Sequence, residues 1–252
     1  MARNPRNATK KESAPRKSAK PPGRGWRVLL TRIFLVTFLV LLFLPPLLVL
    51  TVRYLDPVAT PLMLGRRLLA GQAPQARPSY RFVPLSEVSP HFQKAVWQTE
   101  DARFFTHQGF DWIEVDQAIA QAQRTGRPPR GASTITMQCA RSLFLWQGRS
   151  WVRKPLEAWF TILMETMLTK RRIFELYVNV IETGDQLYGA EAAAMHYWRV
   201  PAKKLTPRQS VMLTASLPNP RKRHPLRPSP EMLRYAARVQ GLLEKSPPLR
   251  KW

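Results

Sequence analysis

The stretch IFLVTFLVLLFLPPLLVLTV, residues Ile33–Val52, decides where the rest of the chain must lie. It carries no charged residue and is bounded by Arg32 and Arg53. Twenty residues of α-helix rise about 30 Å, which matches the hydrocarbon core of a bilayer. The Pro45-Pro46 pair would kink a helix, but membrane spans tolerate proline when neighbouring groups satisfy the freed carbonyls. We therefore predict a transmembrane helix over residues 28–53.

The sequence around this span indicates its orientation. A cleaved signal peptide is the alternative, but its apolar core would be shorter and a small-residue cleavage site would follow it. Residues 1–32 contain ten Lys/Arg and one acid, Glu12. This composition predicts a disordered basic tail over residues 1–27, and flanking positive charge keeps such a tail in the cytoplasm. The rest of the chain is then expected outside the cytoplasm.

The composition limits the class of partner. The formal net charge of +24 indicates an acidic partner, such as nucleic acid, anionic lipid headgroups or a phosphorylated substrate. A location outside the cytoplasm argues against nucleic acid. The single cysteine, Cys139, excludes an intrachain disulfide and a multi-cysteine metal site, and is most simply a small buried hydrophobe.

Helix signals dominate beyond the span. The proline-rich residues 54–80 indicate an extended linker, and no later segment shows a convincing strand-like alternation longer than four residues. The domain over residues 81–246 is therefore expected to be mainly α. Predicted helices cover residues 91–105, 111–122, 133–145, 151–168 and 170–182, with Ser133 and Ser150 as N-caps, and further helices start at Thr206-Pro207 and Ser229-Pro230. The last of these is expected to pack in the core.

Two polar motifs could carry chemistry in the first half of the domain. Glu100 and Asp101 lie at a predicted helix end, followed by Phe104 and His107. Burial of one carboxylate there would raise its pKa toward the range useful for a general base. In GASTITMQCAR, residues 131–141, a glycine turn, free helix N–H groups and an arginine could cradle phosphate. A solvated helix end and a polar helix face are the alternative interpretations.

Two more motifs follow. Arg153 and Lys154 lie one helical turn from Glu157, which favours an ordinary helix ion pair or a carboxylate that organises a pyrophosphate, directly or through a metal. The run KRRIFELYVNVIETG, residues 170–184, places charges beside an apolar stripe and could equally be a solvated charged face.

The order and spacing of these four motifs, from about Phe82 to Pro220, resemble those of the peptidoglycan glycosyltransferases of glycosyltransferase family 51. That family polymerises lipid II on the outer, periplasmic face of the cytoplasmic (inner) membrane. With one N-terminal span and no room for a transpeptidase domain, the chain resembles the monofunctional biosynthetic members. The resemblance implies a lysozyme-like, all-α glycosyltransferase domain with a small membrane-associated subdomain.

The resemblance also implies roles for individual residues. Glu100 matches the general base, which takes the proton of an acceptor sugar hydroxyl, and the reaction releases undecaprenyl diphosphate with inversion. Glu157 matches the acid that stabilises the leaving group. The other matches lie around the base (Asp101, Phe104 and His107) or near the sugar and diphosphate (Ser133, Thr134, Gln138, Arg141, Arg153 and Lys154).

The implied cofactor is a divalent cation, Mg²⁺ or Mn²⁺, although the sequence shows no independent metal site. Implied partners are lipid II, the growing glycan chain, anionic membrane lipids, and division or elongation proteins. Two positions depart from the family pattern. Met137 stands where glutamine is usual, and Arg141 stands where lysine is usual, so turnover could differ.

Two other functions are considered. A lysozyme or lytic transglycosylase would share the fold, but it handles no diphosphate, so the many cations around the site would be unexplained. A membrane-anchored scaffold without activity is the second alternative, and Met137 is its direct support.

Overall fold

The computed structural model describes residues 24–69, 79–128, 131–146, 148 and 150–249. The chain separates into two units, one ending at Phe43 and the other running from Leu44 to the C-terminus. Helix α1 (Arg24–Tyr54) contains the boundary and continues through Pro45 and Pro46. Among the described residues it is the one helix long and apolar enough to cross a membrane. The helix predicted over residues 28–53 is present, whereas the predicted tail over residues 1–27 lies largely outside the described residues.

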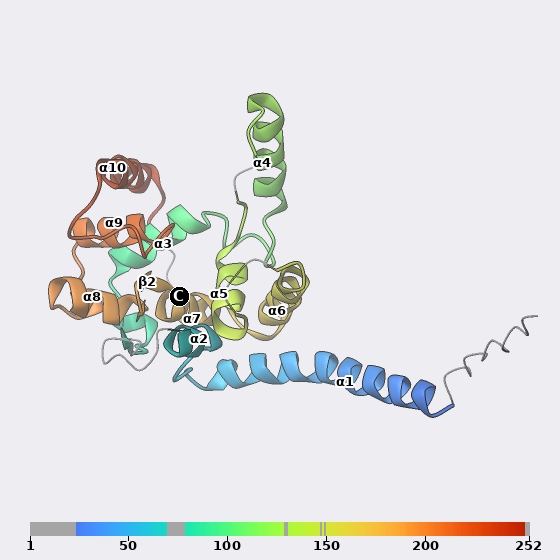
Figure 1. Ribbon diagram of the computed structural model, residues 1–252. Helices are drawn as coiled ribbons and strands as arrows, with labels where there is room; N and C mark the ends of the chain where they lie inside the picture. The colour runs from blue at the N-terminus through green and yellow to red at the C-terminus, as the bar shows by residue number, and fades with distance from the viewer. Residues whose placement is uncertain (1–23, 70–78, 129–130, 147, 149, 250–252) are drawn as a thin grey trace, which may run out of the picture. The chain divides into compact units, whose positions relative to one another are not determined.

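The second unit is mainly α, as predicted (Figure 1). Its helices are α2 (Pro61–Leu69), α3 (Pro90–Glu100), α4 (Trp112–Thr125), α5 (Ile135–Phe144), α6 (Arg153–Met167), α7 (Lys170–Val180), α8 (Ala190–Trp198), α9 (Pro207–Ser216) and α10 (Pro230–Lys245), with 3₁₀ turns η2 (Leu85–Glu87) and η3 (Ala202–Lys204). Three short strands, β1 (Ser79–Tyr80), β2 (Glu182–Gly184) and β3 (Leu187–Tyr188), form a sheet in the order β1-β3-β2. Strand β3 is parallel to β1 and antiparallel to β2.

Part of the segment expected to be an extended linker is a helix. In α2, Met63 is buried and its backbone N–H bonds to Thr60 Oγ1 at 3.3 Å, and the helix packs against α5. The run PLMLGRRLL is only nine residues long and lies among prolines, which favours an extended segment when the sequence is considered alone. Tertiary contact with α5 stabilises a helix that propensity alone would not predict.

Several helix ends differ from those predicted. The helix expected to reach residue 105 ends at Glu100, and the helix expected to reach residue 182 ends at Val180, where a strand follows. Thr134, and not Ser133, is the N-cap of α5, because its hydroxyl accepts the N–H of Met137. Ser150 is likewise not a cap, since α6 begins at Arg153. The predicted caps Asp111, Thr206 and Ser229 are confirmed.

Helix α7 lies in the core, and the charged side chains of Arg172 and Glu175 are only 16% and 14% exposed. The solvated-face interpretation therefore holds for Arg171 alone among these three. The apolar residues of α7 from Ile173 to Val180 are buried. Asn179 exchanges two hydrogen bonds of 2.9 Å with the backbone of Val83, and Glu175 accepts the N–H of Leu85 at 2.8 Å. These polar side chains satisfy backbone groups that would otherwise be buried without partners. Cys139 is buried too, as predicted, and burial raises the pKa of its thiol.

Arg172 ties α7 to the end of α1. Its guanidinium donates to the carbonyl oxygens of Val52 at 2.9 Å and Leu55 at 3.0 Å, and to Asp56 Oδ1 at 2.8 Å. Carbonyls at a helix C-terminus lack intrahelical partners, so a charged donor there stabilises the end of α1. We expect Arg172→Ala to lower the free energy of unfolding by about 2–3 kcal/mol, measured by denaturation in detergent. The exposed neighbour Arg171 gives the control, and an equal effect of Arg171→Ala would contradict this prediction.

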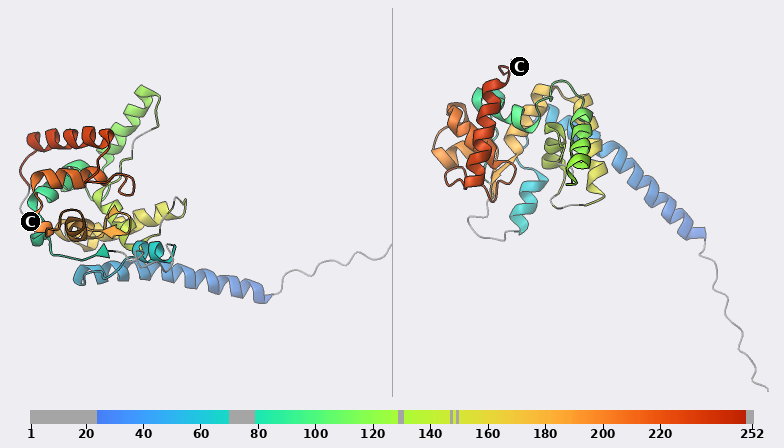
Figure 2. Two further views of the ribbon diagram at one scale, coloured as in Figure 1. Left: turned by 60° about the vertical axis from the view of Figure 1, so that its left-hand side comes forward. Right: turned by 90° about the horizontal axis from the view of Figure 1, so that it is seen from above.

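Most helices of the second unit belong to one of two groups. Helices α3, α9 and α10 pack together, and α5 packs against both α6 and α7 (Figures 1 and 2). Helix α4 projects away from these groups and exposes Trp112, Ile113 and Ile119. Helix α10 buries Met232, Ala236 and Val239 against α9, so the expectation that it packs in the core is confirmed. The end of α3 and the start of α5 carry the first two motifs.

Candidate active site

Glu100 is the last residue of α3, and its carboxylate lies beside α5. Its Oε2 accepts a hydrogen bond from Gln138 Nε2 at 3.0 Å. Burial raises the pKa of Glu100, and the neighbouring Asp101 adds to this, whereas the Gln138 bond and Arg141 oppose it. The net shift is upward, so this carboxylate holds a proton more readily than an ordinary glutamate. That property suits a general base.

Tyr177 orients the partner of Glu100. Its hydroxyl donates to Gln138 Oε1 at 3.0 Å, which leaves the amide N–H₂ of Gln138 to face Glu100. Burial raises the pKa of Tyr177 well above its ordinary value, so the hydroxyl stays a donor. Tyr177 was not among the predicted site residues. Its presence in the fourth motif was the available signal in the sequence.

Asp101 and His107 join the end of α3 to the start of α5. Both Asp101 oxygens lie 3.0 Å from His107 Nε2, and Oδ2 also accepts the N–H of Ile135 at 3.0 Å. His107 Nδ1 accepts the N–H of Gly109 at 3.1 Å, so Nε2 carries a proton and donates to the carboxylate. Asp101 and His107 therefore fix the turn after Glu100 and act as supporting residues.

Phe104 and Thr134 hold the same turn. Phe104 is fully buried against His107 and Phe174 and contributes packing. Thr134 donates to the Gly109 carbonyl at 2.6 Å while it caps α5. Gly109 has a φ of +89°, and a Cβ there would lie 2.6 Å from a methyl group of Thr161, so the turn requires glycine.

A cavity of about 340 Å³ opens beside Glu100. Ser133 lines it, and its hydroxyl is buried with no hydrogen-bond partner within the described part of the chain. Leu242 of α10, which is half-exposed, also lines it. Arg103 and Asp111 line it as an ion pair of 2.8 Å. Sequence reasoning missed Leu242, which lies far along the chain, and Arg103, which resembles an ordinary surface charge.

A second cavity, of about 290 Å³, is cationic. Gln138, Arg141, Arg153 and Tyr177 line it. Gln138 also bonds to Glu100, which lines the first cavity, so the two cavities are linked through this hydrogen bond. A carboxylate of raised pKa therefore stands next to a site that can hold an anion.

Glu157 lies behind this site and not in it. Its carboxylate is fully buried, with Oε1 3.8 Å from Arg141 Nη1 and 3.6 Å from Lys154 Nζ. Neither oxygen has a hydrogen-bond partner among the residues that the structure describes. Glu157 lines neither of the two cavities. The structure thus brings it together with Lys154, as the spacing predicts, and also with Arg141, which the spacing does not predict. Any effect of Glu157 on a bound anion passes through these cations.

The two basic residues at the start of α6 differ in position. Arg153 donates to the carbonyl oxygens of Trp146 and Gly148, which closes the loop before α6, and its Nε has no partner in the described ranges. Lys154 is 58% exposed and does not line the cationic cavity. Arg153 is therefore placed toward an anion in the cavity, and Lys154 is placed toward Glu157.

One group of side chains has the composition of a metal site. Ligand atoms of Asp101, His107 and Asp111 lie within 4.8 Å of one another. Each is already engaged, however, since Asp111 accepts from Arg103 and from the N–H of Glu114, and Asp101 and His107 bond to each other. A cation there would have to break these bonds, so this cluster does not fit a metal as arranged.

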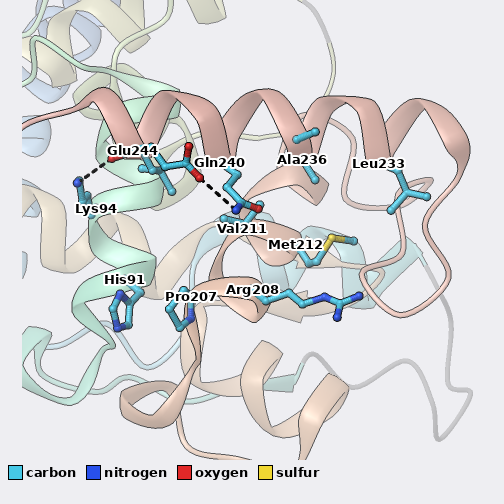
Figure 3. A pocket seen from close by; sticks show the side chains of 12 residues that line it. His91, Lys94, Pro207, Arg208, Val211, Met212, Leu233, Ala236, Gln240 and Glu244 are labelled. Atoms are coloured by element: carbon cyan, nitrogen blue, oxygen red, sulfur yellow. Dashed lines mark hydrogen bonds between the residues drawn. The ribbon is translucent and has the colours of Figure 1, made fainter.

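A larger cavity, of about 680 Å³, lies between α3, α9 and α10 (Figure 3). Its walls are largely apolar, with Val211, Met212, Leu233 and Ala236, and Lys94 Nζ donates to the Leu243 carbonyl at 3.0 Å along one edge. It shares no lining residue with the two cavities beside Gln138. Residues of all four motifs line the two smaller cavities, so these cavities form the candidate site.

Comparisons with known proteins show the family of the chain. Residues 68–245 match the family model described as Transglycosylase. The chain is 43% identical over 226 residues to the biosynthetic peptidoglycan transglycosylase of Xanthomonas campestris pv. campestris (strain B100), covering 89% of this chain and 91% of the relative. It is 44% identical over 206 residues to the protein of the same name from Caulobacter vibrioides, covering 82% and 87%.

The matched residues include all four motifs. The lysozyme-like fold and the glycosyltransferase activity expected from these motifs are those of the matched family. The interpretation as a scaffold without activity is not supported. The chain belongs to the transglycosylase family and is a peptidoglycan glycosyltransferase of cell-wall biosynthesis.

Proposed function

We propose that the chain polymerises lipid II into β-1,4-linked glycan strands and releases undecaprenyl diphosphate. The observation that carries this proposal is the hydrogen bond between Glu100 and Gln138, which sets a carboxylate of raised pKa beside a cationic cavity. A transfer from a lipid diphosphate needs both a base for the acceptor and cations for the leaving group.

Glu100 takes the proton from the 4-hydroxyl of the acceptor GlcNAc. The hydroxyl oxygen then forms a bond to C1 of the terminal MurNAc of the growing chain, and the bond from C1 to the diphosphate oxygen breaks. The electron pair leaves with the undecaprenyl diphosphate, and attack from the opposite face converts the α-linkage into a β-linkage. Arg141 and Arg153 offset the charge that develops on the diphosphate.

Other residues position these groups. Gln138 donates to Glu100 and holds its carboxylate in one orientation, while Asp101 and His107 fix the backbone that follows. The unpartnered hydroxyl of Ser133 is available to a sugar in the first cavity. Glu157 keeps Arg141 in place through their ion pair of 3.8 Å.

Exposed apolar side chains support the proposal that the substrate lies in a membrane. Helix α1 is a candidate membrane anchor, and exposed apolar side chains also occur at Trp112 and Ile113 of α4, Trp151 before α6 and Ile162 of α6. We propose that these surfaces form the membrane-associated subdomain, on the periplasmic face of the inner membrane. Anionic lipids, and division or elongation proteins, are proposed partners there.

The test is polymerisation by the purified full-length chain. Labelled lipid II in detergent micelles, with and without Mg²⁺ or Mn²⁺, should yield glycan strands that a muramidase degrades, together with free undecaprenyl diphosphate. The divalent cation stays a proposal that this comparison decides. Absence of strands under every condition would contradict the proposal, and release of soluble fragments from purified sacculi would instead indicate a lytic enzyme.

A further inference from the structure

The wall of the cationic cavity includes a helix that none of the four motifs covers. Helix α2, in the segment between the membrane-spanning helix and the domain, packs against α5, which carries Gln138 and Arg141 (Figure 1). Leu62 and Arg66 of α2 line the cavity together with Gln138, Arg141 and Arg153. The helix thus places a third arginine at the site.

Arg66 is held by an incomplete ion pair. Its Nη2 lies 3.3 Å from Glu182 Oε2, and the two side chains are only 17% and 16% exposed. The Nε of Arg66 and the Oε1 of Glu182 are buried without a hydrogen-bond partner in the ranges that the structure describes. An arginine and a carboxylate that serve only each other commonly form two parallel bonds. Here one donor and one acceptor stay free, and buried polar groups of this kind call for a partner.

The charge of the cavity indicates what that partner is. Its lining contains Arg66, Arg141 and Arg153 against a single acid, Glu182, so positive charge is in excess. Guanidinium groups bind phosphate oxygens through paired N–H donors, and several of them around one cavity fit a diphosphate better than a neutral sugar.

We propose that Arg66 is a further substrate-binding residue, whose guanidinium contacts the diphosphate of the lipid-linked donor while Glu182 orients it. This inference rests on the proposed function. It means that the segment after the membrane anchor forms part of the donor site and does more than connect the anchor to the domain. A role limited to tying α2 to β2 is the alternative, because Arg66 and Glu182 belong to these two elements.

The experiment compares Arg66→Gln with Arg67→Gln in the full-length chain. Arg67 is the next residue of the same helix and is exposed, so the two variants lose the same charge at the same distance from the anchor. Arg66→Gln should raise KM for lipid II about tenfold and weaken the binding of farnesyl diphosphate to a similar extent, because a charge-assisted hydrogen bond is lost. Arg67→Gln should stay within about twofold of the wild type, and Arg66→Lys should retain part of the affinity.

Glu182→Gln separates binding from structure. It removes the negative charge beside Arg66 but keeps an oxygen that can accept the bond and orient the guanidinium, so binding of farnesyl diphosphate should be retained or strengthened even if Tm falls. A merely structural pair would make Arg66→Gln and Glu182→Gln alike in Tm and in KM. That result, or equal KM values for Arg66→Gln and Arg67→Gln in a chain that polymerises lipid II, would overturn the inference alone. A wild type that makes no strands would overturn the proposed function.

Discussion

Replacement of Glu100 by glutamine is expected to lower the rate of lipid II polymerisation about 10³-fold, the size of effect that a positioned general base contributes. Glutamine fills the same space and can still accept the bond from Gln138, but it cannot take the proton of the acceptor hydroxyl. The measurement is the initial rate of strand formation. Glu114→Gln is the matched control, since Glu114 lines the same cavity and the change in charge is identical.

The same substitution should not destabilise the fold. Burial raises the pKa of Glu100 above 4.5, so the folded state disfavours its charged form. Ionisation of Glu100 therefore destabilises the folded state. This destabilisation is absent at a pH below the pKa of Glu100 in the unfolded chain, and it is complete once the pH has risen through the pKa of Glu100 in the folded protein. Glutamine has no such cost, and Tm at neutral pH should be equal to or higher than that of the wild type. A lower Tm, or polymerisation at the wild-type rate, would contradict the assignment of Glu100.

Arg141→Met is expected to lower kcat/KM for lipid II by about 10²–10³-fold, because it removes a cation that faces the developing charge on the diphosphate. It also takes a positive charge away from Glu157, whose carboxylate is fully buried. A buried carboxylate without its counter-charge destabilises a protein, so Tm should fall as well. The measurements are kinetics on lipid II and thermal unfolding in detergent.

A second substitution separates these two effects. Glu157→Gln added to Arg141→Met removes the buried charge, so the double variant should regain Tm but not activity. If activity returned with Tm, Arg141 would act only by neutralising Glu157, and the leaving-group role would be wrong. Glu157→Gln alone should reduce activity less than Arg141→Met, since Glu157 lines neither cavity.

Local signals in the sequence predict a good part of the fold. Cap residues followed by proline set the starts of α9 and α10, and Asp111 sets the start of α4. The site is also partly local, because Gln138 and Arg141 lie about one turn apart on α5 and share a face. That spacing predicts that both face one anion, and both line the cationic cavity.

Tertiary contacts decide the rest. Arg66 and Leu242 reach the site from helices far away in sequence, so no motif contains them. The burial of Glu157 depends on how α6 packs against α5, and spacing alone shows only that cations lie one turn away. The charges of the fourth motif resemble a solvated face because their partners, such as the Val52 carbonyl for Arg172, lie more than a hundred residues earlier.

The most direct test of a base beside Gln138 is the pH dependence of kcat/KM, which reports groups of the free enzyme. The activity should fall on the acidic side with an apparent pKa above the ordinary glutamate value of 4.5, because burial raises the pKa of Glu100. In Gln138→Leu, which loses the hydrogen bond that lowers this pKa, the fall should move to higher pH. The account would be contradicted if the activity of the wild type fell on the acidic side with an apparent pKa of 4.5 and if Gln138→Leu did not move this fall.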